Sequence, residues 1–573
     1  MTVMLLKING KLNKYYLQTL CMLFYPGAKF GEDECDNNDE SAGAQKIDSG
    51  TSELKTGTTV NNGEFTGSAK STKSKQKRDE TSDAPYEKRL LSAEFTRIDR
   101  EDGVEVTCRF GVDGRFAEFT HFEPANGASR LLGSPVKGDE FGQAARMAAG
   151  IAALGAGKKL FGATPAWGLL TGIRPGKMAA GLLEERIEDE KSSRKRTPSE
   201  CRAILTQNFL LTPRKAALAV EIAQSERRIA KLAIQDGKPT CSIYIGIPFC
   251  PSRCAYCSFV SYTSRKLLSL IPEYLDRICI DLADTIEYIR SRRMHVVSVY
   301  IGGGTPTTLN EQQLEKLLKI VSNGINTKKL AEFTLEAGRP DTITAEKLRI
   351  ARENGVSRVS INPQTLNDTI LRSIGRRHTV DDFNRAYALA KESGIACINT
   401  DLIAGLPGDN FGSFSKSIDG IIALEPENIT VHTFCVKKSA EILKIDTEIY
   451  NRSAEETVKS VDYSQLRLKN AGYVPYYIYR QKNTVGNLEN VGFSKRGAEG
   501  VYNVLMMEEM HSIFAVGAGA VTKLVRQSDE NSPKRSIERI FEPKYPYEYL
   551  ATDRNSELAK RTAAYDKFFD FEY

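Results

Sequence analysis

Three cysteines stand within eight residues of one another, at positions 250, 254 and 257 of a chain of 573 residues. Their spacing is Cys-x3-Cys-x2-Cys, in a loop that follows a predicted strand at 242–247. Three thiolates on one tight loop can hold three corners of a 4Fe–4S cube and leave the fourth iron open to a small molecule. Zinc is the alternative, but a structural zinc site needs four closed ligands. No nearby Cys or His supplies a fourth.

Composition and charge exclude several other classes of protein. With 41% hydrophobic and 27% charged residues, the chain has an ordinary globular composition. A net charge of +6 does not favour nucleic acid as a partner. No run approaches the 18 apolar residues of a membrane span, and the stretch at 15–25 predicts a short structural helix after a strand rather than a signal peptide. We therefore expect a cytoplasmic protein without a membrane span.

The elements that must position the cysteine loop form a regular series from residue 242 onward. Six β-then-α units predict an α/β fold with a parallel sheet and right-handed crossovers, either doubly wound or closed into a barrel. In both folds, functional groups gather at the carboxyl ends of the strands. The predicted strands are 242–247, 296–301, 332–336, 358–362, 396–403 and 428–434. The predicted helices are 266–292, 311–323, 344–354, 366–374, 380–393 and 412–424.

The chain divides into three predicted units. Residues 1–240 form an α+β region, with two or three antiparallel strands over 91–122, helices from about 141 and over 213–232, and a polar linker at 186–199. Within it, 31–85 is too poor in apolar residues to offset its ordering entropy and is predicted to be a disordered insertion. The series of β-then-α units occupies 241–435, and a smaller C-terminal domain follows at 436–573.

The residues at successive strand ends narrow the choice of protein family. Gly304 and Thr305 follow the second strand, and Glu336, Gln364 and Asp401 end or follow the next three. The cysteine loop resembles that of the radical S-adenosylmethionine (SAM) superfamily, in which SAM chelates the open iron and is cleaved to methionine and a 5′-deoxyadenosyl radical. With the strand ends, 242–435 resembles the oxygen-independent coproporphyrinogen III oxidase family. This resemblance implies that 241–435 is a partial (β/α)6 barrel with the cluster at its mouth and that the C-terminal domain at 436–573 covers the substrate.

The resemblance also assigns site residues. It implies that Cys250, Cys254 and Cys257 bind the 4Fe–4S cluster. The positions that match SAM-binding residues of the family are Tyr244, Gly304, Thr305, Glu336, Gln364, Arg376 and Asp401. These types suit the ligand, because a carboxylate can accept from ribose hydroxyls or the amino group, and an arginine can pair bidentately with the methionyl carboxylate.

Motifs on both sides of the barrel point to one branch of the family. The segments 167–175, 475–483, 486–492 and 515–520 resemble the branch called coproporphyrinogen dehydrogenase, HemZ type. The implied reaction is oxidative decarboxylation of coproporphyrinogen III propionates to vinyl groups, giving protoporphyrinogen IX in haem biosynthesis, with an electron donor such as a flavodoxin or ferredoxin. Arg480 and Lys482, amid tyrosines, are candidate partners for the substrate carboxylates.

Two positions differ from the oxidase pattern. Gly246 stands where the oxidase has a histidine, and Phe259 stands where it has a fourth cysteine; the family's haem-chaperone branch shares the second difference. They motivate an alternative function, a haem-binding or haem-delivery protein without decarboxylase activity, for which His432 and His511 are candidate axial ligands. A radical enzyme acting on another substrate is a third hypothesis.

Overall fold

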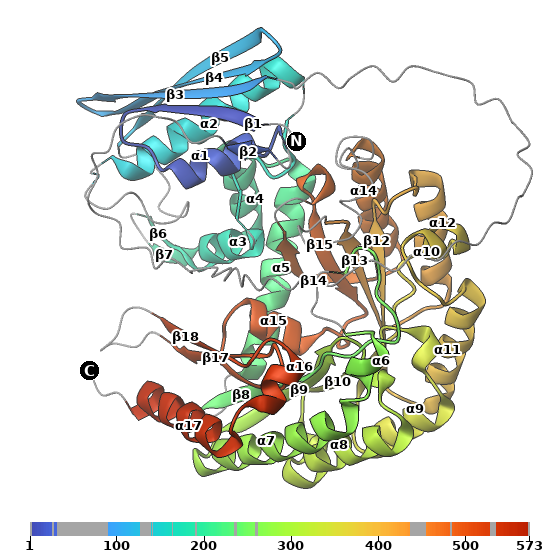
Figure 1. The fold of residues 1–573 in the computed structure, drawn as a ribbon. Coiled ribbons are helices and arrows are strands. Elements are labelled where there is room, and N and C mark those ends of the chain that lie inside the picture. Colours follow the sequence, from blue (N-terminus) through green and yellow to red (C-terminus); the bar gives the residue numbers. More distant parts are fainter. Residues whose placement is uncertain are drawn as a thin grey trace, which may run out of the picture.

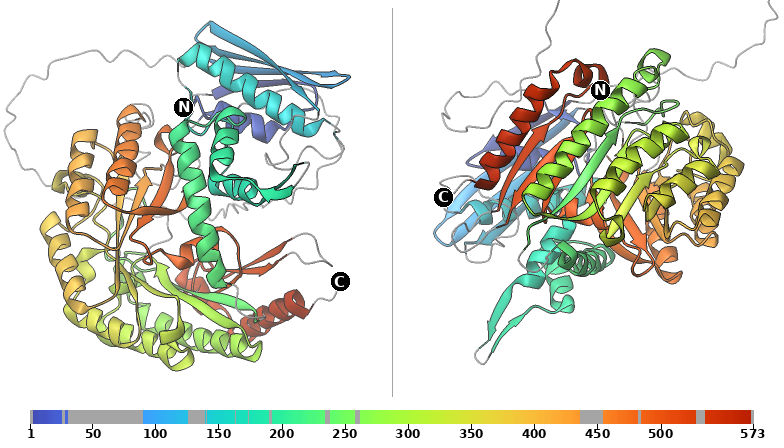
Figure 2. Two further views of the ribbon diagram at one scale, coloured as in Figure 1. Left: turned by 180° about the vertical axis from the view of Figure 1, so that it is seen from behind. Right: turned by 90° about the horizontal axis from the view of Figure 1, so that it is seen from below.

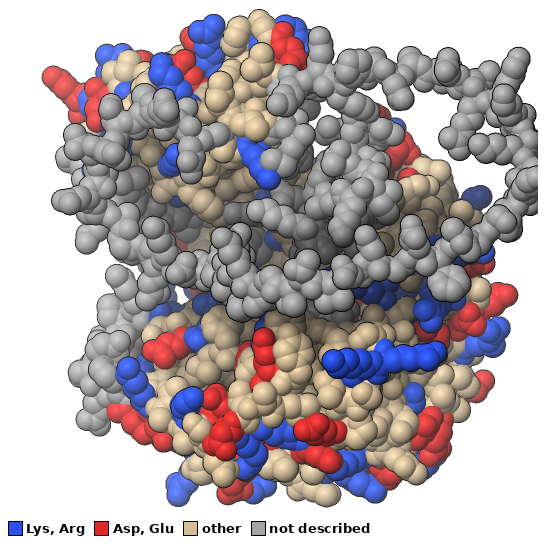
Figure 3. Space-filling model, viewed as in Figure 1, with Lys and Arg blue, Asp and Glu red and all other residues tan. Residues whose placement is uncertain are grey.

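The computed structural model describes residues 3–25, 28–30, 90–125, 139, 141–162, 164–172, 174–189, 192–233, 238–257, 262–435, 454–481, 484–527 and 535–570. The insertion predicted at 31–85 lies outside these residues. Among the described helices, none is long and apolar enough to cross a membrane. Acidic and basic side chains intermingle on the described surface seen in Figure 3.

The N-terminal unit is a sheet that carries both of its helices on one face (Figure 1). Its strand order is β2-β1-β3-β4-β5, and β3, β4 and β5 pair antiparallel as predicted. Alternation buries Met4, Phe95 and Phe110 beneath helix α2. The small residues of α2 allow close approach, since a Cβ at Gly155 would lie 2.4 Å from the Phe119 ring. The elements are β1 (Val3–Asn9), α1 (Lys14–Cys21), β2 (Lys29–Phe30), β3 (Leu91–Arg100), β4 (Gly103–Val112), β5 (Arg115–Pro124) and α2 (Gly142–Phe161).

A small helical segment connects this unit to the barrel. It comprises α3 (Pro175–Glu184), β6 (Arg186–Asp189), β7 (Ser192–Lys195), α4 (Pro198–Gln207) and α5 (Pro213–Ala230). The linker predicted at 186–199 is wrong, because β6 and β7 form an antiparallel hairpin that leads into α4. Some of the charged side chains that suggested a solvated linker form ion pairs at the base of the hairpin, such as Arg196 with Glu185 at 3.1 Å.

The α/β barrel unit has the predicted parallel strands, each joined to the next by helices on the outside (Figure 1). Every second strand residue faces outward, and most of these residues are apolar, as with Ile243, Val299 and Leu335, all fully buried. The strands are β8 (Thr240–Ile247), β9 (His295–Gly303), β10 (Glu332–Glu336), β11 (Arg358–Ser360), β12 (Cys397–Ala404) and β13 (Asn428–Thr433). The helices are α6 (Arg265–Leu268), α7 (Ile271–Ser291), α8 (Glu311–Gly324), α9 (Ala345–Glu353), α10 (Asp368–Ser373), α11 (Val380–Ser393) and α12 (Phe411–Ala423).

The C-terminal segment extends the barrel sheet at both edges (Figure 2). Within the described residues this sheet has the order β14-β15-β13-β12-β11-β10-β9-β8-β16-β17-β18. The boundary predicted at 435 therefore lies inside one continuous sheet. The C-terminal elements are α14 (Ala454–Asn470), β14 (Val474–Arg480), β15 (Glu489–Ser494), α15 (Val501–Met507), β16 (Ser512–Val516), β17 (Val521–Arg526), β18 (Ser536–Phe541), α16 (Pro546–Ala551) and α17 (Arg554–Asp570).

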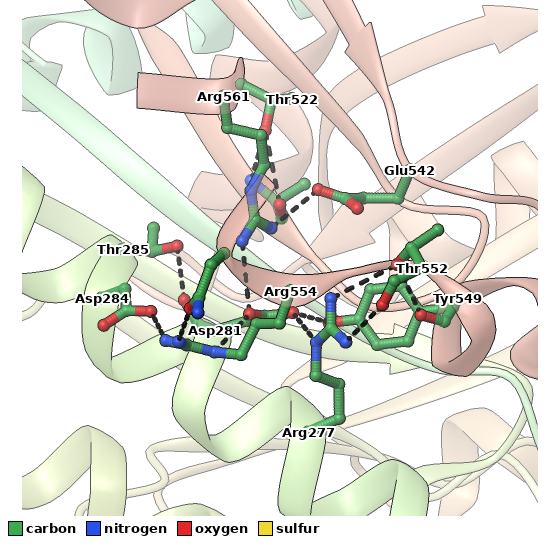
Figure 4. A network of polar contacts seen from close by, with 12 residues as sticks. Arg277, Asp281, Asp284, Thr285, Thr522, Glu542, Tyr549, Thr552, Arg554 and Arg561 are labelled. Carbon is green, nitrogen blue, oxygen red and sulfur yellow. Dashed lines mark hydrogen bonds and ion pairs between the residues drawn. The ribbon is translucent and has the colours of Figure 1, made fainter. Parts of the chain in front are cut away.

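A buried carboxylate attaches the last two helices to α7 (Figure 4). Asp281 is fully buried and lies 3.1 Å from Arg277, 3.3 Å from Arg561 and 3.5 Å from Arg554. It also accepts a hydrogen bond from Tyr549. Three arginines from two separate segments thus converge on one side chain, and neighbouring carboxylates share in balancing their positive charges.

Replacing this carboxylate is expected to loosen the C-terminal helices. Asp281→Asn removes one buried negative charge from this group of arginines and takes from Arg277 the carboxylate with which it pairs, which costs about 3 kcal/mol. Hydrogen exchange of α17 amides should then become roughly 100-fold faster if they exchange by local opening. Asp276→Asn, on the exposed side of the same helix, is the matched control and should leave exchange unchanged. Equal exchange in α17 of Asp281→Asn and the unmodified chain would contradict this role.

Candidate functional site

The cysteine loop leaves the carboxyl end of β8 and is fastened at both ends. The amide of Cys250 donates to the Tyr262 carbonyl at 3.1 Å, and the amide of Tyr262 donates to the Pro248 carbonyl at 3.0 Å. Farther along, the amide of Ala255 donates to the Ile374 carbonyl at 3.0 Å. Cys250 and Cys254 are buried, and Cys257 is partly exposed. Backbone hydrogen bonds therefore hold the described part of the loop, residues 248–257, in place.

The end of β9 passes close beneath this loop. The amide of Thr305 donates to the Phe249 carbonyl at 2.8 Å, and its hydroxyl lies 3.3 Å from the Cys250 sulfur. A Cβ at Gly304 would lie 2.6 Å from the same carbonyl oxygen, so this position requires glycine. The predicted pair Gly304 and Thr305 thus lies directly against the cysteine loop.

No three His, Cys, Asp or Glu side chains among the described residues are arranged to hold one ion. A zinc site would need four ligands around one centre. Three thiols on one loop can instead supply three corners of a polynuclear cluster.

On the inner side of β8 and β9, Glu336 meets a stack of tyrosines. The rings of Tyr300 and Tyr502 lie 4.5 Å apart and nearly parallel, and Tyr244 stacks on Tyr300 at 6.2 Å. The Tyr300 hydroxyl donates to Glu336. Burial raises the pKa of Glu336 to about 7, and the nearby charge of Asp401 adds to the effect. This carboxyl therefore gains or loses a proton near neutral pH.

A second inward-facing carboxylate has the opposite environment. Asp401 accepts from Asn399 at 2.8 Å and lies 3.5 Å from the His432 ring nitrogen Nε2. Burial acts to raise the pKa of Asp401, but His432 and Asn399 more than offset it and hold that pKa below its usual value. Environments that separate the pKa values of two neighbouring carboxyl groups are typical of functional sites.

Gln364 sits in a conformation that glutamine rarely adopts. Its φ is +70°. Its backbone N–H donates to the Asp401 carbonyl, and its backbone carbonyl accepts from the Ile403 N–H, both on the neighbouring strand β12. The side-chain oxygen Oε1 is buried and has no hydrogen-bond partner in the described structure. A buried acceptor without a partner is costly, so this atom is suited to receive a donor from a bound ligand.

Arg376 is placed near the cluster loop but is already hydrogen-bonded. Its guanidinium donates to the Gly338 carbonyl at 2.8 Å, the Asn362 carbonyl at 3.1 Å and the Tyr256 hydroxyl at 3.1 Å. It therefore ties the cysteine loop to the ends of β10 and β11. A direct pairing of Arg376 with the methionyl carboxylate stays a prediction.

The residues predicted to contact the substrate, or haem in the alternative, have other surroundings. Arg480 is 7% exposed and donates to the carbonyls of Leu170 and Asn487, so its donors face the protein interior. Lys482 lies outside the described residues. Both ring nitrogens of His511 lie within 3.2 Å of the Thr240 and Ser242 hydroxyls. His432 contacts Asp401 through one nitrogen and the Tyr479 hydroxyl, at 3.2 Å, through the other.

Comparison with known proteins identifies the family. A family model described as the radical SAM superfamily matches residues 244–420. The chain is 37% identical over 390 residues to the oxygen-independent coproporphyrinogen-III oxidase-like protein HemZ of Bacillus subtilis (strain 168), a match covering 68% of this chain and 75% of the relative. It is 30% identical over 310 residues to the heme chaperone HemW of that strain, covering 53% of this chain and 77% of the relative. Among solved structures, coproporphyrinogen III oxidase (HemN) from Escherichia coli matches with a TM-score of 0.44 and 19% identity, over 59% of this chain and 73% of that chain.

The chain therefore belongs to the radical SAM family of the oxygen-independent coproporphyrinogen-III oxidase-like protein HemZ, as the motifs predicted. The predicted partial barrel and the cofactors, a 4Fe–4S cluster and SAM, are those of this family. The described residues fit both groups. One loop supplies three thiols, and the unpartnered oxygen of Gln364 offers an acceptor at the carboxyl ends of the strands.

Two residues of this site were not recognised from the sequence. Tyr300 orients Glu336, and Arg339 contacts the cysteine loop. Tyr300 lies two residues before the glycine run, at a position whose inward direction follows from strand alternation. That periodicity was the available signal for Tyr300. For Arg339, the only signal was its place shortly after a strand end.

Proposed function

We propose that this protein is an oxygen-independent coproporphyrinogen III oxidase that converts propionate side chains to vinyl groups and yields protoporphyrinogen IX. One observation carries the proposal: the cysteine loop lies at the same end of the barrel as an inner face of tyrosine rings and two neighbouring carboxyl groups. The HemZ relative, whose printed name is oxidase-like, supports it. We also propose that it acts in the cytoplasm in haem biosynthesis, with a flavodoxin or ferredoxin as the electron donor.

The chain's own residues have distinct roles in this proposal. Cys250, Cys254 and Cys257 would ligate the cluster. When bound, cluster and SAM together would supply a carbon radical that removes one hydrogen atom from a propionate; CO2 would then leave, and one electron would pass to an external one-electron acceptor. Glu336 and Gln364 would orient SAM, and the tyrosine rings of the inner face offer flat contacts to a macrocycle. We propose SAM contacts for five further residues as well: Tyr244, Gly304, Thr305, Arg376 and Asp401.

The proposed role of Glu336 predicts a pH dependence of SAM affinity. The ionised carboxylate accepts hydrogen bonds from the ligand more strongly than the neutral acid. Because the pKa of Glu336 is raised to about 7, SAM affinity should rise about tenfold between pH 6 and pH 8. Anaerobic titration calorimetry measures this directly. Glu336→Gln should bind more weakly and lose the dependence; an unchanged pH profile in this variant would contradict the assignment.

The second candidate is a haem-delivery protein that keeps the barrel and the cluster. The HemW relative and Gly246 favour it. Phe259, which also motivated it, lies outside the described residues. Its two candidate axial ligands are less favourable, since both nitrogens of His432 and of His511 already have neighbours at 3.5 Å or less. A haem ligand from either would first have to give up such a contact.

An anaerobic assay separates the two candidates. The reconstituted protein is given SAM, a reduced flavodoxin and coproporphyrinogen III, and a parallel sample is titrated with haem. The oxidase proposal predicts vinyl-bearing porphyrinogen, CO2 and 5′-deoxyadenosine in matching amounts. Stoichiometric haem binding without any decarboxylated product would overturn it and favour haem delivery.

A further inference from the structure

Arg339 is a buried arginine immediately beside the cysteine loop. It lies three residues after Glu336, between Gly338 and Pro340, and its side chain is only 3% exposed. Its Nε atom pairs with Asp341 at 3.2 Å. A buried guanidinium keeps its positive charge in any accessible pH range. Arg339 therefore brings a fixed charge into an enclosed part of the site.

The two remaining nitrogens of this guanidinium contact the cysteine loop itself. Nη1 lies 3.4 Å from the sulfur of Cys254 and 3.3 Å from the carbonyl oxygen of Ser252, and Nη2 lies 2.5 Å from the Ser252 hydroxyl. One planar fork thus holds a loop backbone group and one cluster-ligand sulfur together. Asp341 fixes the plane of the fork from its other side.

We propose that Arg339 is a positioning residue that raises the reduction potential of the cluster through a charge-assisted hydrogen bond to the Cys254 thiolate. Reduction adds a negative charge to the cluster, and a donor with a positive charge stabilises the reduced form more than the oxidised one. Hydrogen bonds to ligand atoms are a general means of tuning a metal centre. The inference concerns the cluster alone and does not depend on the substrate proposed above.

The test is a redox titration of the reconstituted cluster followed by electron paramagnetic resonance, without SAM or substrate. Arg339→Met keeps much of the side-chain volume but removes the charge and the donors. We expect its equilibrium constant for reduction to fall at least tenfold, a shift of 59 mV to more negative potential for one electron. Arg339→Lys keeps the charge and should restore much of the shift. An unchanged potential in Arg339→Met at full iron content would overturn the proposal.

A control and a second measurement keep the test decisive. Arg253→Met removes the same charge from an exposed position in the same loop, and solvent screening should leave its potential unchanged; an equal shift in both variants would contradict a specific contact. Should Arg339→Met fail to hold four irons, the unmodified chain is labelled with nitrogen-15 in its arginine guanidinium groups. Pulsed resonance of the reduced cluster should then show coupling to a labelled nitrogen, and no coupling would overturn the contact.

Discussion

Cys254→Ala is expected to reduce SAM cleavage to the rate seen without protein. The cluster would keep two thiolate ligands. The variant would also lack the Cys254 sulfur, which accepts a hydrogen bond from Arg339. Because Cys254 is buried in a loop fastened at both ends, water or a small thiol would have difficulty replacing it. Cys250→Ala and Cys257→Ala should behave in the same way, since each removes one corner of the cluster.

Iron content and 5′-deoxyadenosine production are the two measurements for this prediction. The matched control is Cys201→Ala, which removes a fully buried thiol from α4 and should leave both unchanged. If Cys254→Ala retained a full cluster and still cleaved SAM, the ligand assignment would be wrong.

The second large effect is expected at Glu489, where the two motifs that flank the barrel meet. This carboxylate is 1% exposed and accepts from Lys215 at 2.7 Å, Trp167 at 2.7 Å and Gln465 at 2.6 Å. Glu489→Ala leaves the Lys215 ammonium buried without its closest counter-charge and the indole N–H without an acceptor. We expect a loss of about 4 kcal/mol at this junction.

The junction carries its own probe, because Trp167 is the sole tryptophan of the sequence. Its fluorescence during urea unfolding reports the region around Glu489, even though a chain of this size need not unfold in one step. Asp462→Ala is the control, since this partner of Lys215 is 29% exposed and should contribute little. A Trp167 transition that occurs at the same urea concentration in Glu489→Ala and the unmodified chain would refute this account.

Local patterns predicted the barrel well. The strand expected at 332–336 is β10 itself, and that at 242–247 differs from β8 only at its first residues. Strand periodicity and the alternation of elements are local properties of the chain, so they can be read from neighbouring residues. The cysteine loop could be predicted for the same reason, because its three cysteines lie within eight residues of sequence.

Contacts between distant segments could not be predicted in this way. Strand β16 pairs with β8 although 265 or more residues separate them, and no local signal specifies that partner. Arg480 looked available for a carboxylate because the sequence does not reveal that the Leu170 carbonyl lies beside it. The flanking motifs indicated the branch of the family, but the described structure uses Trp167 and Glu489 to join the N-terminal region to the sheet.

In the proposed reaction, the site removes a hydrogen atom from a propionate of coproporphyrinogen III. The most direct measurement uses substrate labelled with deuterium on its propionate carbons, incubated anaerobically with the reconstituted protein, SAM and a reductant. Mass spectrometry should find deuterium in the 5′-deoxyadenosine, together with a vinyl-bearing product. Unlabelled 5′-deoxyadenosine and an unchanged porphyrinogen would contradict the claim.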